Sequence, residues 1–103
     1  MYIELTERYT NSLTDLSTQN KKVYFFEERN IAKGISNHGV YFMCEGNDNF
    51  DACTVYVLKI EDGSFDVYEK KFVKLGESFE CKVPQTEGGL VSLNFELKDD
   101  KNA

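Results

Sequence analysis

The chain has 103 residues, enough for one domain that buries roughly two-thirds of the surface exposed by its unfolded form. It carries 18 acidic and 12 basic residues, and this net charge of -6 argues against direct binding to nucleic acid or to anionic membranes. Phe and Tyr contribute 8 and 6 residues, so a packed core needs neither disulfides nor metals. We predict a single domain over residues 1–98 and a mobile tail over residues 99–103.

The first segment has the spacing of an amphipathic helix. Apolar residues recur there every three or four positions, namely Tyr2, Leu5, Tyr9, Leu13 and Leu16. A second, shorter helix is expected between residues 30 and 36, where Ile31 and Ile35 are four apart and Gly39 follows. The front of the chain is therefore predicted to be largely helical.

The rest of the chain is strand-like. Residues 23–26 are aromatic and β-branched, and residues 40–44 are apolar on both parities, as in a strand covered on both faces. Apolar and polar residues alternate over 79–83 and again over 91–97. The loops at 74–77 and 85–89 are short and contain glycine, which favours antiparallel neighbours.

The dipeptide Asp62-Gly63 predicts a β-hairpin, because a two-residue type I′ turn needs positive φ at both positions. This turn fixes the register of the two strands. The predicted pairs are Glu61 with Ser64, Ile60 with Phe65, Lys59 with Asp66, Leu58 with Val67, and Val57 with Tyr68.

Together these elements predict an α+β domain. We expect an antiparallel β-meander of about five to six strands, with the N-terminal amphipathic helix packed on one face and a short second helix beside it.

Catalytic groups are few. His38 is the one histidine, and the cysteines, Cys44, Cys53 and Cys81, lie in strand-like contexts typical of buried, reduced thiols. No nucleophile motif such as Gly-x-Ser-x-Gly occurs, no Cys-x-x-Cys pair suggests zinc, and the glycines form no phosphate-binding loop. We expect no catalytic residue, no cofactor and no metal site.

Aromatic residues that exceed the needs of the core point to a binding surface. The predicted register leaves Tyr56, Tyr68 and Phe72 as candidates for the less covered face of the sheet, near Asp66 and Glu69. An aromatic patch bordered by acids is typical of a protein-binding face. The alternative is that these aromatics belong to the core.

Three functions remain open. The first is a non-catalytic protein-binding module, most simply an inhibitor of a larger basic protein, a class that includes nucleic-acid-handling proteins. In composition alone the chain resembles the small acidic inhibitors that bacteriophages make against host nucleases and defence systems. The second is an assembly subunit of a virion or complex, and the third is a small enzyme that uses His38 and a cysteine.

The odd number of cysteines and the lack of an apolar run long enough to span a bilayer predict a cytoplasmic protein. We expect a monomer or a small homo-oligomer whose partner is a protein, neither nucleic acid nor membrane.

Overall fold

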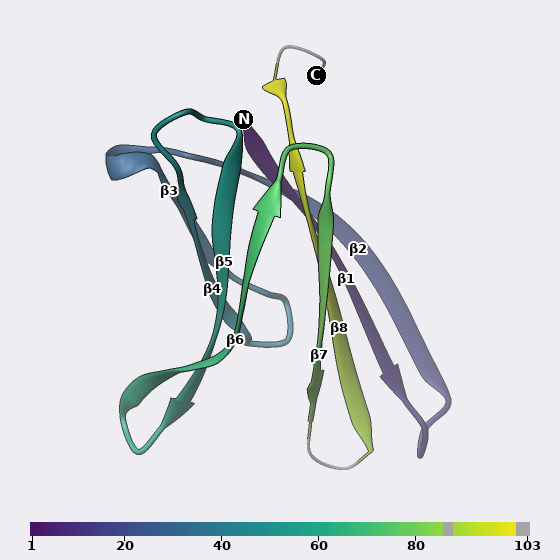
Figure 1. Ribbon diagram of the computed structural model, residues 1–103. Coiled ribbons are helices and arrows are strands. Elements are labelled where there is room, and N and C mark those ends of the chain that lie inside the picture. The colour runs from purple at the N-terminus through teal and green to yellow at the C-terminus, as the bar shows by residue number, and fades with distance from the viewer. Residues whose placement is uncertain (86–87, 101–103) are drawn as a thin grey trace.

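The computed structural model describes residues 1–85 and 88–100 and consists almost entirely of β-strands (Figure 1). The strands are β1 (Tyr2–Asn11), β2 (Leu16–Phe25), β3 (Ile31–Ile35), β4 (Tyr41–Gly46), β5 (Ala52–Glu61), β6 (Ser64–Lys74), β7 (Ser78–Pro84) and β8 (Gly89–Lys98). One 3-10 turn, η1 (Glu28–Asn30), is the only helical element in this part of the chain. None of the described segments is a helix with the length and apolar character needed to cross a membrane.

The strands form two antiparallel four-stranded sheets that pack face to face. The order is β2-β1-β8-β7 in the first sheet and β3-β4-β5-β6 in the second. Each strand lies beside its neighbours in sequence within a sheet, and the chain changes sheet between β2 and β3 and between β6 and β7. The pairing of β8 with β1 brings the start of β1 beside the end of β8, with Tyr2 opposite Lys98 (Figure 1).

The predicted α+β class is therefore wrong, and the N-terminal amphipathic helix does not exist. Residues 2–11 form β1, which pairs along its whole length with both β2 and β8. Ile3 and Leu5, two residues apart, point into the core, whereas Leu13 lies in the β1–β2 turn and is 75% exposed. The apolar residues recur at helical spacing, but the segment forms a strand because hydrogen bonding to β2 and β8 outweighs this local preference.

The short second helix is also wrong. Residues 31–35 form β3, which pairs with β4 from Ile31 opposite Glu45 to Ile35 opposite Tyr41. Ala32 is buried between the sheets, so inward and outward side chains alternate along this segment with a period of two residues. The strands also number eight in two sheets rather than about five or six in one meander covered by a helix.

The hairpin prediction is confirmed at four of its five pairs. Asp62 and Gly63 have φ values of 51° and 80°, as the turn requires, and the register runs from Glu61 opposite Ser64 to Leu58 opposite Val67. The pairing of Val57 with Tyr68 is wrong, because the register shifts there and Val57 lies opposite Glu69. Tyr68 is the extra residue of a β-bulge, which no turn signal predicts.

The alternating segments at 79–83 and 91–97 are strands, as predicted, and supply much of the core. Val91, Leu93, Phe95 and Leu97 are each fully buried, and Phe95 meets Phe42 of the second sheet with ring centroids 5.3 Å apart. The predicted loop at 85–89 includes residues 86–87, and the predicted tail includes residues 101–103; these five lie outside the described residues. Asp100 accepts a hydrogen bond from the N-terminal amine at 2.8 Å.

The junction between β2 and β3 is closed by Tyr24, which covers Gly34. A Cβ atom placed on Gly34 would lie 2.6 Å from Cε1 of Tyr24 and 3.1 Å from Cζ of Phe42. The Tyr24 ring meets the Phe42 ring edge-on, with centroids 4.8 Å apart. Glycine at this position lets an aromatic side chain of the first sheet pack directly on the backbone of the second.

Gly34→Ala is expected to destabilise the domain by about 1–3 kcal/mol, because the added methyl group displaces the Tyr24 ring from its contact with Phe42. Chemical denaturation measures the change. In the background of Tyr24→Ala the same substitution should cost much less, so the two changes should be non-additive. Equal cost in both backgrounds would show that the ring does not close this junction.

Candidate protein-binding face

The outer face of the β3-β4-β5-β6 sheet is built by strict alternation of side chains. On β5, Cys53, Val55 and Val57 are fully buried between the sheets. Tyr56 and Leu58 therefore point to the opposite side, away from the first sheet, and are half-buried. Residues directly opposite each other in register point to the same side of the sheet, so inward and outward side chains also alternate on β3, β4 and β6.

An apolar row crosses all four strands on this outer side. Ile35 lies opposite Tyr41, Tyr41 opposite Leu58, and Leu58 opposite Val67. Ile60 and Phe65 form a further apolar pair beside it, and the Phe65 ring lies 5.2 Å from the Tyr41 ring. Much of this surface is open, with exposed fractions of 46% for Ile35, 49% for Ile60, 58% for Phe65 and 56% for Val67.

Two further rows lie next to it towards the β4–β5 turn. The nearer row consists of Lys33, Met43, Tyr56 and Lys70, and the outermost of Ile31, Glu45, Thr54 and Phe72. We call the apolar members of these rows the apolar face: Ile31, Ile35, Tyr41, Met43, Tyr56, Leu58, Ile60, Phe65, Val67 and Phe72.

The outer side of the first sheet is different. Its central strands present Glu4, Thr6 and Arg8 from β1 beside Ser92, Asn94 and Glu96 from β8. Lys98 donates a hydrogen bond to Glu4 at 3.1 Å. Apolar groups lie only towards the two ends of this side, with Tyr2, Val23 and Phe25 at one end and Pro84 and Leu90 at the other. The centre of one outer side of the sandwich is thus polar, and the centre of the other is apolar.

The five residues predicted to bind a partner are divided by this architecture. Tyr56 and Phe72 lie on the apolar face. Tyr68 and Glu69 are at the junction with β7, where the Tyr68 hydroxyl donates to the Lys82 carbonyl oxygen at 3.3 Å and Cys81 Sγ donates to Glu69 at 3.1 Å.

Asp66 lies opposite Lys59, on the other side of the β5–β6 hairpin from the Ile60 and Phe65 pair. The predicted aromatic patch bordered by acids is therefore not a single surface, and the charges nearest its aromatic members are lysines.

Sequence reasoning missed most of the apolar face, namely Ile35, Tyr41, Met43, Leu58, Ile60, Phe65 and Val67. The hairpin register had already placed Leu58, Ile60, Phe65 and Val67 together. What concealed the surface was the helical interpretation of residues 30–36, which removed Ile35 from the sheet. The signal present in the sequence is the alternation of Ile31, Lys33 and Ile35 with the small residues Ala32 and Gly34.

His38 is held by a buried carboxylate. Glu7, only 4% exposed, accepts hydrogen bonds from the backbone amides of Asn37 at 2.7 Å and His38 at 3.1 Å, and its Oε2 lies 2.9 Å from His38 Nδ1. The imidazole also stacks on the Tyr9 ring, with centroids 4.3 Å apart. These contacts fasten the β3–β4 turn to the first sheet.

Burial alone would raise the pKa of Glu7. The hydrogen bonds from His38, Asn37 and Ser36 outweigh burial, so the pKa of Glu7 lies below its usual value of 4.5. A carboxylate is therefore kept ionised inside the protein. Sequence reasoning missed Glu7 because nothing local distinguishes it from the exposed acids.

The three thiols are buried and unpaired, which fits the expectation of reduced core residues. Burial, with a hydrogen bond to Glu69, raises the pKa of Cys81 to about 12, and the pKa of Cys44 is raised by its shared hydrogen bond with Cys53 and by burial. The thiols of Cys44 and Cys81 are therefore protonated at neutral pH. The His38 ring contacts Glu7 and Tyr9. Among residues 1–85 and 88–100, no three His, Cys, Asp or Glu side chains are grouped so as to hold a metal ion.

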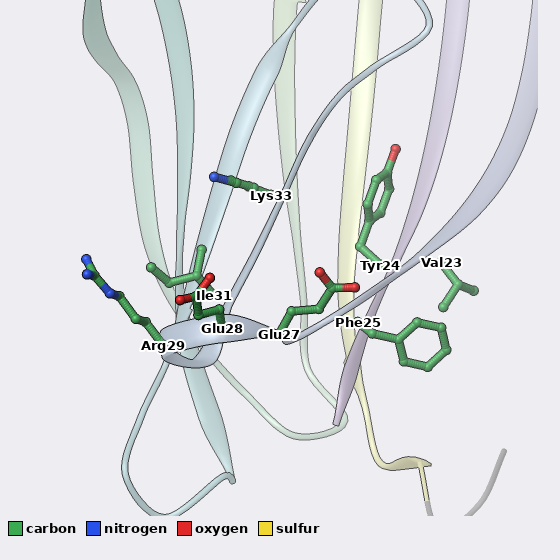
Figure 2. A pocket seen from close by; sticks show the side chains of 8 residues that line it. All are labelled: Val23, Tyr24, Phe25, Glu27, Glu28, Arg29, Ile31 and Lys33. Carbon is green, nitrogen blue, oxygen red and sulfur yellow. The ribbon is translucent and has the colours of Figure 1, made fainter.

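Two hollows in the surface have the volume of a small-ligand site. One, of about 590 Å³, lies at the β2–β3 connection, where the side chains of Glu27, Glu28, Arg29 and Lys33 mix both charges (Figure 2). Figure 2 shows these side chains spreading from the turn rather than converging on a point. The other, of about 470 Å³, lies between His38, the β5–β6 hairpin and the end of β7, and both polar and apolar side chains line it. Neither gathers the convergent polar groups that orient a small ligand.

Glu7→Gln is expected to lower the free energy of unfolding at pH 7 by about 2 kcal/mol, because hydrogen bonds to a charged acceptor are replaced by weaker ones. The pKa of Glu7 is depressed in the folded state, so its stabilisation is present above pH 4.5 and is lost as the pH falls below that value. The difference between wild type and variant, followed by denaturant titration, should therefore shrink on acidification.

Glu80→Gln, at an exposed carboxylate 3.9 Å from Lys82, serves as the control and should change stability little at any pH. A Glu7→Gln deficit that stays constant down to pH 3 would contradict the assignment.

Comparison with known proteins found no matching family model, no similar curated protein and no similar solved structure.

Proposed function

We propose that this chain is a non-catalytic protein-binding domain that contacts its partner through the apolar face. The observation that supports the proposal is the asymmetry of the sandwich. Large apolar side chains stand in register across four strands on one outer side, while the outer side of the first sheet is polar. A solvent-exposed apolar surface of this kind is costly in water and is typical of an interaction site.

The dimensions suit such a role. Four strands spaced about 4.8 Å apart span about 14 Å, and four rows of outward side chains separated by about 6.7 Å along the strands span about 20 Å. The four rows, with their charged members included, therefore span roughly 300 Å², which is the size of the largest apolar patch on a typical monomer, a patch that is often functional. Tyr41, Tyr56, Phe65 and Phe72 supply the aromatic groups that dominate the energetics of protein interfaces.

Inhibition of a basic protein remains a prediction drawn from the net charge of -6. Within the rows of the apolar face the charged residues are Lys33, Lys70 and Glu45, so the acidic surplus lies elsewhere on the domain. Acids outside the contact surface favour the encounter with a basic protein more than they strengthen the bound state. A cytoplasmic location is likewise proposed from the sequence alone.

Val67→Asp should weaken partner binding and leave the fold intact, because Val67 is 56% exposed at the edge of the apolar face. The partner is first identified by affinity capture from lysate and is then purified and titrated by calorimetry. We expect the dissociation constant to rise at least about tenfold.

Val23→Asp is the matched control. It is also a valine on the outer side of an edge strand, 43% exposed, but on the first sheet. Binding that survives Val67→Asp, or that both variants lose equally, would contradict the proposal. A large homo-oligomer that Val67→Asp dissolves, seen by light scattering, would instead favour the assembly-subunit alternative.

A further inference from the structure

We infer that the surface bound by the apolar face is an apolar protein patch bordered by carboxylates, which Lys33 and Lys70 contact from opposite edges. This inference rests on the proposed function and adds the chemistry of the partner.

The two lysines occupy equivalent places in the sheet. Lys33 is on β3 and Lys70 is on β6, the two edge strands, and both belong to the row that contains Met43 and Tyr56. The Lys70 ammonium lies 5.8 Å from the centroid of the Tyr56 ring. A lysine thus stands on each side of an apolar and aromatic centre, and three strand spacings separate the backbones of the two lysines by about 14 Å.

Neither ammonium has an ion-pair partner within residues 1–85 and 88–100, although acids outnumber bases in the chain by 18 to 12. Other lysines are paired: Lys98 and Lys21 both reach Glu4, at 3.1 and 3.6 Å. A partner surface that covers the apolar row also removes water from the ammonium groups of Lys33 and Lys70. This desolvation is unfavourable unless the partner supplies negative charges that pair with them. Carboxylates on the partner, spaced like the two lysines, meet this requirement.

Glu45 is the one acid in these rows. It lies in the outermost row beside Thr54, away from the apolar row of Ile35, Tyr41, Leu58 and Val67. Its carboxylate therefore falls at the rim of the contact, where it can remain hydrated.

Two other occupants fit less well. A second copy of the chain, related by a two-fold axis parallel to the strands through the centre of the face, would place Lys33 over Lys70 of its neighbour, and like charges would meet. An anionic membrane would be repelled by the net charge of -6.

The test uses a phage-displayed library of random 16-residue peptides. It is selected against the wild-type chain, the single variant Val67→Asp, the double variant Lys33→Glu/Lys70→Glu, and the double variant Lys21→Glu/Lys82→Glu. The last pair changes the net charge equally but lies on the outer side of the first sheet. Thermal unfolding verifies that each variant is folded.

Wild type and the Lys21/Lys82 variant should enrich peptides that combine apolar residues with at least two Asp or Glu. The Lys33/Lys70 variant should enrich Lys or Arg instead. The best wild-type peptide should bind the Lys33/Lys70 variant at least about tenfold more weakly by calorimetry, and its binding to wild type should weaken with added salt.

The outcomes separate the inference from the proposed function. Peptides that need an intact Val67 but show no acidic preference would overturn the inference and leave the proposed function standing. Selection of the same peptides by Val67→Asp, or failure to enrich any peptide that this variant loses, would contradict the proposed function itself. Dimerisation of the wild type, or its binding to phosphatidylserine vesicles, that is lost in Val67→Asp would identify the other occupants and overturn the inference.

Discussion

The rest of the structure depends on the pairing of β1 with β8. Ten residues at the start of the chain pair without a break with ten near its end, from Tyr2 opposite Lys98 to Asn11 opposite Gly89. These two strands are the centre of the first sheet and carry Ile3, Leu5, Leu93 and Phe95, all buried. Without this pairing the sheet would divide into two isolated hairpins, which are marginally stable in water.

The second sheet packs on this central pair, and its own connectivity is local. Three successive hairpins join β3 to β6, and the sheet is tied to the first through contacts such as those of Phe42 with Phe95 and of Tyr24 with Gly34. A two-layer sandwich buries only the inner side of each sheet. The outer sides are free to differ, and here one is polar and the other carries the apolar face.

The groups that could have carried chemistry serve the fold instead. Glu7 and His38 hold the β3–β4 turn against the first sheet, and the thiols of Cys44, Cys53 and Cys81 are core side chains. The apolar face and its two flanking lysines remain exposed, and their exposure does not stabilise the fold. The protein-binding function proposed above accounts for this exposed apolar surface in a chain whose other sheet has a largely polar outer side.

The sequence by itself determined the features that are set by neighbouring residues. Asp62-Gly63 dictated the β5–β6 turn and four of its pairs, and the alternation around Phe79 and Phe95 marked β7 and β8. The bulge at Tyr68 was not predicted, because no glycine or proline marks the extra residue in the sequence. Tyr56 and Phe72 were correctly singled out as outward-facing, but their companions were not identified.

Only the tertiary structure decided that residues 2–11 and 31–35 are strands. Their apolar spacing fits a helix as well as a strand, and the choice is made by hydrogen bonding to β8 and β4 and by burial against the opposite sheet. The complete apolar face is likewise not evident from the sequence. The hairpin register joins only its members on β5 and β6, and those on β3 and β4 become neighbours through the pairings of these strands. Local patterns report the conformation of a few adjacent residues, whereas a surface is made by pairings between residues far apart in sequence.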